Sequence, residues 1–403
     1  MIPMNIKTYI LVAIIVFSSL LVTYILMSNW IDVSTSTHQE TSEKFTHTTV
    51  PSSELLGQFS VAEEWKGLTG WINSDPFSLA NQRGKLVLID FWTYTCVNCI
   101  RTLPYLKDWH SRYADSGLVI LGIHAPEFEF EKIHENVANA VDRFEIDYPV
   151  AQDNDFITWR IFQGSDGGVW PAKYLIDGNG FIRYTKLGEG GYAETEQKIR
   201  QILSEVTSAT QIMEIDPVII PSKKTYETVN TYGVTRELYA GFNRNYSNIR
   251  KGIAPYVTNL EYYDAPNQVF DYMDPETYLN HFIHLHGEWF AGPESLTHAR
   301  STELFEDYIT IKFFATTANV VLYLQTGEDP YIVRVTVDEM PIDLSYAASD
   351  ILYDGERNSY INVDQSRMYR LVKSSEFGGH ELSLSSNSDN FTVFAYTFGA
   401  FQD

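Results

Sequence analysis

Between residues 57 and 207, short apolar runs alternate with stretches whose apolar residues recur at helical spacing. The runs 85–92 and 118–124 are apolar on both faces, which is typical of strands in a parallel sheet covered by helices. The turn 178–180, Gly-Asn-Gly, separates the last two strands and predicts a hairpin. The pattern predicts an α/β domain, with elements in the order βαβα and then ββα over 85–92, 97–113, 118–124, 130–144, 172–177, 181–187 and 194–206.

From residue 229 to residue 403 the pattern changes to short runs of alternating apolar and polar positions. Gly, Asp, Asn and Pro separate these runs, as in antiparallel all-β domains. We therefore expect an all-β sandwich, similar to a jelly roll, joined to the α/β domain by a linker over 208–228. The predicted strands are 308–314, 320–324, 331–337, 360–363, 368–372, 381–384 and 391–398.

Residues 9–27 carry no charge and are long enough to cross a bilayer as one helix. They form the centre of an expected membrane anchor over 1–29, and the polar residues 30–56 are expected to be a flexible spacer. Lys7 precedes the apolar run, which favours an N-terminus in the cytoplasm and a body outside it. The alternative is a cleaved signal peptide, which would export the same body. Both interpretations predict an extracytoplasmic location.

The length of 403 residues allows two domains, and the formal charge is −23. Nucleic-acid binding requires a concentrated Lys and Arg surface, so this charge argues against a nucleic-acid partner. It also argues against docking of a basic face on anionic lipid.

The chain contains only two cysteines, which lie three residues apart in Cys96-Val97-Asn98-Cys99. A disulfide that closes so short a loop stabilises a protein little, so the spacing favours thiol exchange over a structural bond. Cys96 lies where a helix is predicted to begin, and the helix dipole there favours the thiolate form of a cysteine. Cys99 lies one turn further on and could resolve a mixed disulfide. We therefore expect Cys96 to be the nucleophile and Cys99 the resolving thiol.

Three further residues are candidates for this site. Asp90 lies in an otherwise apolar strand, where burial should raise its pKa and allow it to accept the proton of Cys99. A simpler interpretation is an acid that caps a turn or meets solvent at the end of its strand. Trp170 and Pro171 precede the strand at 172–177, and a proline there favours a cis peptide bond, although an ordinary trans loop is the alternative.

The segment FWTYTCVNCIRTLPYL resembles the active-site segment of the thioredoxin-like superfamily, and within it that of DipZ-like and TlpA-like proteins. The segments GIHAPEF (122–128) and WPAKYLIDGNG (170–180) also resemble DipZ. This resemblance implies a thioredoxin fold. It also implies that Pro171 is a cis-proline that aligns the substrate and that Trp92 lies beside the site. The residues that match the superfamily spacing for the buried acid, the tryptophan, the two thiols and the helix kink are Asp90, Trp92, Cys96, Cys99 and Pro104.

The resemblance to DipZ continues after the linker, in HLHGEWFAGPES (284–295) and FTVFAYTFGAF (391–401). It implies a C-terminal β-sandwich similar to carbohydrate-binding modules, and hence glycan as a possible partner of residues 229–403. The aromatic residues that could stack on sugar rings are Tyr239, Phe242, Trp289 and Phe290, although aromatic residues in a sandwich more often belong to the core. DipZ carries a multi-span electron-transfer domain and this chain has one expected span, so a separate membrane reductase would supply its electrons.

Thiol–disulfide exchange on disulfide-bearing envelope proteins is therefore the expected activity, without cofactor, and we favour the reducing direction because no cation stands between the two cysteines. A zinc site would need about four ligands, and no second cysteine pair exists. Copper handling remains an alternative, with His124 as the additional ligand, although a core histidine is the simpler interpretation. Glu127 could tune the thiols or could be an ordinary solvated loop acid. A glycan-binding or protein-binding envelope module on a thioredoxin scaffold is the second class of function.

Overall fold

The computed structural model describes residues 59–165, 167–206 and 233–399. The expected anchor, spacer and linker lie outside these residues, and the boundaries of these segments stay predictions. Among the described residues, no helix is both long enough and apolar enough to cross a bilayer. All of the described residues belong to one compact unit.

The first part of the described chain contains a six-stranded sheet in the order β1-β4-β3-β2-β5-β6. Strand β2 is parallel to β3, and β3 is parallel to β4. The pairs β2–β5, β5–β6 and β1–β4 are antiparallel. The strands are β1 (Thr69–Ile72), β2 (Leu86–Trp92), β3 (Leu118–His124), β4 (Val150–Gln152), β5 (Ala172–Ile176) and β6 (Ile182–Leu187).

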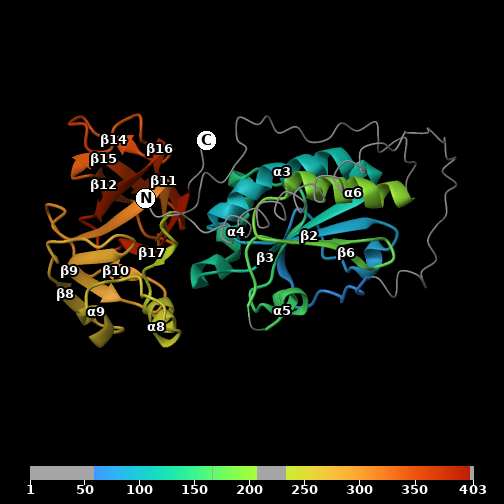
Figure 1. The fold of residues 1–403 in the computed structure, drawn as a ribbon, viewed down its shortest axis with the longest axis horizontal. Helices are drawn as coiled ribbons and strands as arrows, with labels where there is room; N and C mark the ends of the chain where they lie inside the picture. The colour runs from blue at the N-terminus through green and yellow to red at the C-terminus, as the bar shows by residue number, and fades with distance from the viewer. Residues whose placement is uncertain (1–58, 166, 207–232, 400–403) are drawn as a thin grey trace, which may run out of the picture. The chain divides into compact units, whose positions relative to one another are not determined.

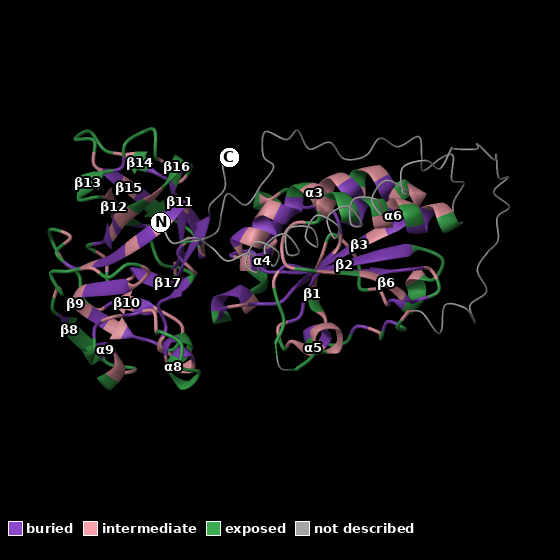
Figure 2. Cartoon of the chain, in the orientation of Figure 1, coloured by how far each residue is buried: buried purple, intermediate pink, exposed green. Residues whose placement is uncertain are grey.

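Helices cover both faces of this sheet, with α3, α4 and α6 on one face and α5 on the other (Figure 1). Strand β2 is buried along its whole length, because its alternate side chains enter the two apolar clusters on opposite faces (Figure 2). The α/β thioredoxin-like domain predicted from the sequence is confirmed. The helices are α3 (Val97–Tyr113), α4 (His134–Arg143), α5 (Ile157–Gln163) and α6 (Tyr192–Val206).

The helix predicted over 130–144 is shorter in the structure. A 3-10 turn, η3 (Glu129–Lys132), comes first, and α4 begins only after Ile133, whose backbone is extended. The strands β1 and β4 and the helix α5 were not predicted from the sequence, because each is too short to show a clear apolar period.

The second part of the described chain is an all-β sheet of eleven strands, with two short helices, α8 (Phe242–Arg250) and α9 (Glu261–Asp264). Its main strand order is β14-β15-β12-β16-β11-β17-β10-β9-β8. The strands are β7 (Leu238–Tyr239), β8 (Val269–Tyr272), β9 (Ile283–Ala291), β10 (Leu296–His298), β11 (Tyr308–Tyr323), β12 (Tyr331–Val337), β13 (Met340–Pro341), β14 (Leu352–Tyr353), β15 (Ser359–Val363), β16 (Arg367–Ser385) and β17 (Thr392–Gly399).

Two of these strands are longer than the sequence predicted. The segments expected at 308–314 and 320–324 form one strand of 16 residues, β11, and those at 368–372 and 381–384 form one strand of 19 residues, β16. The two strands pair with each other along their length, with two register shifts. These shifts lie where the alternation of apolar and polar residues in the sequence is weak, and the pairing continues on both sides of them.

Candidate redox site

Cys96 lies between β2 and α3, at the residue that caps the N-terminus of the helix. Its backbone is extended, and its Sγ accepts a hydrogen bond of 3.3 Å from the backbone N–H of Cys99. The side chain is half-buried, so it is accessible to a reaction partner. Helix α3 therefore begins where the sequence predicted, and its first turn holds the two sulfur-bearing residues together.

Cys99 lies one turn further along α3 and is buried, with 1% of its surface exposed. Burial raises the pKa of its thiol well above the usual value, and the neighbouring Cys96 and the charge of Asp90 raise it further. Cys99 is therefore a protonated thiol at neutral pH. A base must remove its proton before it can act as a nucleophile.

Asp90 lies on β2 and is 1% exposed. Burial raises the pKa of its carboxyl group, while the nearby ammonium group of Lys173 lowers it. The charge of Asp90 is one of the causes that raise the pKa of the Cys99 thiol, so the two buried groups interact electrostatically. The structure therefore contradicts the alternative of a solvent-facing acid at a strand end.

Lys173 is a residue of this site that the sequence analysis missed. It lies on β5 directly opposite Asp90 in the antiparallel ladder, and its Nζ is 3.3 Å from the carboxylate. Its side chain is completely buried. The signal in the sequence was a lysine inside the apolar strand AKYLI, because a lysine is almost never fully buried without a partner.

The segment that leads into Cys96 is buried, although two of its three residues are threonines. The hydroxyl group of Thr93 lies 3.3 Å from Nε2 of His124, at the end of β3. Burial lowers the pKa of His124 to about 3, so the imidazole is neutral at physiological pH. Tyr94 stacks on the same ring, with centroids 5.5 Å apart. His124 thus has the contacts of a core histidine that supports the loop.

Glu127 and Glu131 follow β3 and lie beside this segment. The carboxylate of Glu127 accepts hydrogen bonds from the hydroxyl of Tyr239, at 2.8 Å, and from Arg244, at 3.0 Å. Burial raises its pKa. The interpretation of Glu127 as a solvated loop acid is therefore wrong. Glu131 is completely buried, and the sequence did not single it out.

The residues expected to position substrate differ in exposure. Trp92 is 1% exposed and packs edge-on against His124, so it supports the site from within the core. Trp170 is half-buried, and its indole N–H donates to the carbonyl of Ala125. The peptide bond between Trp170 and Pro171 is cis.

The four aromatic residues considered for sugar stacking do not form an exposed platform. Tyr239 and Trp289 are buried, at 9% and 0% exposure, and Phe242 packs against the apolar core of the second domain. Phe290 is half-buried on β9. Tyr239 and Trp289 therefore belong to the core, which is the alternative that the sequence analysis gave as the more frequent one.

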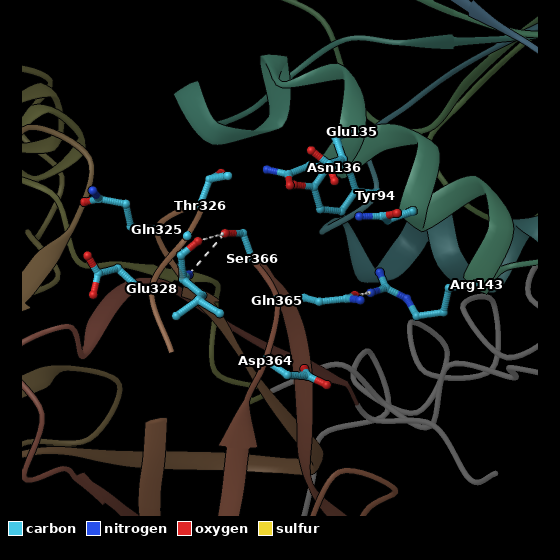
Figure 3. Close-up of a pocket in the computed structure, with 13 residues that line it drawn as sticks. Tyr94, Glu135, Asn136, Arg143, Gln325, Thr326, Glu328, Asp364, Gln365 and Ser366 are labelled. Atoms are coloured by element: carbon cyan, nitrogen blue, oxygen red, sulfur yellow. Dashed lines mark hydrogen bonds between the residues drawn. The ribbon is translucent and has the colours of Figure 1, made fainter. Parts of the chain in front are cut away.

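A polar hollow of about 250 Å³ lies beside Tyr94, in the segment that leads into Cys96 (Figure 3). Tyr94, Arg143 and residues 364–366 contribute to its lining, and Arg143 donates a hydrogen bond of 3.0 Å to Gln365. Neither cysteine lines it. Across the described ranges, no group of three or more His, Cys, Asp or Glu side chains could hold a metal ion.

Two protein families match this chain. The AhpC/TSA family matches residues 61–185, and a family described as the thioredoxin like C-terminal domain matches residues 235–399.

Several individual proteins are also similar to this chain. Protein DipZ of Mycobacterium bovis and that of Mycobacterium tuberculosis are each 38% identical over 239 residues, which is 58% of this chain and 31% of theirs. The chain thus spans about a third of the length of these relatives. Thiol-disulfide oxidoreductase ResA of Bacillus cereus is 27% identical over 34% of this chain and 72% of its own length. A solved thiol:disulfide interchange protein from Chlorobium tepidum is 26% identical over 36% of this chain and 97% of that chain, with a TM-score of 0.32.

Proposed function

We propose that this chain, which is similar to DipZ-like and TlpA-like thioredoxin-fold proteins, is a thiol–disulfide oxidoreductase that acts through Cys96 and Cys99. The observation that carries the proposal is the pairing of an accessible cysteine at a helix N-terminus with a buried cysteine one turn on. The names of ResA and of the Chlorobium protein agree with this chemistry. Its substrates are proteins that carry disulfides.

In the reducing direction, the Cys96 thiolate attacks one sulfur of a substrate disulfide, and the other substrate sulfur leaves as a thiolate that takes up a proton. A mixed disulfide now joins Cys96 to the substrate. The thiol of Cys99 transfers its proton to Asp90, and the resulting thiolate attacks Sγ of Cys96. This step releases the second substrate thiol and leaves the Cys96–Cys99 disulfide, so that two electrons have passed to the substrate.

Asp90 suits the second step because of its position and its environment. The high pKa of Cys99 means that this thiol needs a base, and we assign that role to Asp90, a buried carboxylate whose charge contributes to the high pKa of Cys99. Burial makes Asp90 a stronger base than an ordinary aspartate, while Lys173 keeps the charged form available.

Substitution of each cysteine tests the proposal through insulin reduction with dithiothreitol as the electron source. We expect Cys96→Ser to abolish the catalysed reduction, and Cys99→Ser to accumulate a mixed disulfide with the substrate that can be isolated on a non-reducing gel. Full activity of Cys96→Ser would refute the proposed chemistry.

We further propose that residues 9–27 anchor the protein in a membrane, with its body outside the cytoplasm. The uncharged run and the preceding Lys7 support this arrangement. A separate membrane reductase then keeps the pair reduced, and envelope proteins are the substrates. A reduction potential near −270 mV would fit a reductant and one near −120 mV would contradict this direction.

Glycan binding by residues 229–403 is a second proposal for the C-terminal part, and its support is the resemblance of that part to DipZ. Retention of the protein on immobilised polysaccharide tests it. No retention on any polysaccharide would refute glycan binding and leave the redox proposal intact.

A further inference from the structure

The carboxylate of Glu131 is fully buried and accepts hydrogen bonds from two short segments, the one that leads into Cys96 and the turn that follows β3. One oxygen accepts a 2.5 Å hydrogen bond from the hydroxyl of Thr95, the residue immediately before the nucleophile. The other accepts hydrogen bonds from the backbone N–H groups of Glu127 and Phe128. Burial of a carboxylate is costly unless hydrogen bonds compensate for lost water. Glu131 is therefore poorly explained as a space-filling residue.

The segment before Cys96 is held by apolar packing of Tyr94 and by polar contacts of its two threonines. It leaves β2 after Trp92 and runs through Thr93, Tyr94 and Thr95 before α3 begins. The backbone N–H of Cys96 donates to the carbonyl of Thr93 over 3.3 Å, within the segment itself. The contact of Thr93 with His124 and the hydrogen bond from Thr95 to Glu131 connect it to the end of β3 and the following turn.

The same turn also contacts the C-terminal domain. Tyr239 and Arg244 bind the carboxylate of Glu127. The ring of Phe394 packs against those of Phe128, with centroids 5.0 Å apart, and Phe130, at 4.8 Å. Residues of both domains thus belong to one apolar cluster. Glu131 receives hydrogen bonds from this turn and from the segment before Cys96, so it connects the two.

We propose that Glu131 is a positioning residue for Cys96, and that through it the contact of the C-terminal domain with residues 127–130 sets the reactivity of the cysteine pair. The inference deepens the proposed function, because it rests on exchange at Cys96 and Cys99. In this proposal the C-terminal domain affects the cysteine pair by its contact with residues 127–130, without binding a ligand. Burial raises the pKa of Glu131 to about 7, hydrogen bonding by Thr95 lowers it, and the charge of Glu127 raises it. The charge state of Glu131 therefore depends on its hydrogen bond from Thr95 and on the charge of Glu127.

The experiment compares Thr95→Val, Glu131→Gln and the double variant in the full-length protein. Two measurements are made: the rate of Cys96 alkylation as a function of pH, and the reduction potential of the pair. We expect each single variant to change the dithiol–disulfide equilibrium constant by about tenfold, which is about 30 mV. The double variant should change it by no more than the larger single variant, because both substitutions act on the hydrogen bond between Thr95 and Glu131.

Glu129→Gln is the matched control, because Glu129 lies exposed in the same turn. Wild-type potential and alkylation profile in a folded Thr95→Val variant would overturn the inference, and this conservative variant keeps the test valid if Glu131→Gln fails to fold. Arg244→Gln tests the domain contact, with the exposed Arg250→Gln on the same helix as control. We expect Arg244→Gln to shift the potential in the direction of Glu131→Gln. No shift would overturn the role of the C-terminal domain.

These measurements separate the inference from the function on which it rests. Loss of insulin reduction in Cys96→Ser, together with unchanged potentials in Thr95→Val and Glu131→Gln, would refute the positioning role alone. Shifted potentials in a protein that reduces no disulfide substrate would refute the function.

Discussion

Replacement of Lys173 by methionine should destabilise the protein and change how its stability depends on pH. The ammonium group lies 3.3 Å from the carboxylate of Asp90, which corresponds to a Coulomb attraction of about 5 kcal/mol at an effective dielectric constant of about 20. Burial of the lysine side chain offsets part of this attraction. Loss of one member of a buried pair typically costs about 3–5 kcal/mol, because the other charge stays buried without compensation. We expect a loss of about 3 kcal/mol at pH 8.

The loss should be smaller at pH 5, because Asp90 can then take up a proton and become neutral. Without Lys173 the pKa of Asp90 in the folded state rises further above its unfolded value. The folded state of the variant then binds more protons than the unfolded state, so its stability falls as pH increases through this interval. The wild-type protein has a weaker dependence, because Lys173 counteracts the effect of burial.

The assay is urea unfolding at pH 5 and pH 8, followed by tryptophan fluorescence. Lys186→Met is the control, because Lys186 lies beside Lys173 in the ladder between β5 and β6, on the side away from Asp90. The double variant Asp90→Asn with Lys173→Met should recover much of the lost free energy of unfolding. Equal free energies of unfolding for Lys173→Met and Lys186→Met at pH 8 would refute the reasoning. The mixed disulfide should also resolve more slowly in Lys173→Met at pH 7 and recover at higher pH, where Asp90 is ionised.

Three further substitutions give distinct expected outcomes. Asp90→Asn should slow the decay of the mixed disulfide by about 100-fold in a quenched time course and leave alkylation of free Cys96 unaltered, since only the resolving step needs the base. His124→Gln should keep the shape of the alkylation profile between pH 5 and pH 8, because the imidazole is neutral there; a lost titration step in that interval would contradict its role as a core residue. Phe394→Ala should lower the free energy of unfolding by about 3–5 kcal/mol, since its ring is 8% exposed and packs on two other rings; an unchanged thermal transition would mean that this packing contributes little.

The sequence predicted the strand, the helix and the two cysteines of the site because their signals are local. Strand β2 is apolar on both faces, and Cys96 comes directly before an apolar helical period. The strand β3 and the helix α3 match their predicted bounds. Such signals depend only on neighbouring residues, so no knowledge of the tertiary structure was needed.

The rest of the site depends on contacts between distant residues. Lys173 is 83 positions from Asp90 in the numbering, and only the register of β2 with β5 places them opposite each other. Glu127, Glu129 and Glu131 look alike in the sequence, but the 3-10 turn buries only the last of them completely. Strand β11 continues through residues 315–319, where the weak alternation suggested a break, because β16 pairs with it across this stretch.

The continuous ladder of β11 and β16 affects how the C-terminal domain can open. The first part of β11 borders β9, and its second part, Thr317–Tyr323, borders β17. One pair of strands therefore runs through both regions of the sheet, and its ladder continues across the two register shifts. Amide protons along the whole length of this ladder should consequently exchange with solvent in a single concerted event, instead of region by region.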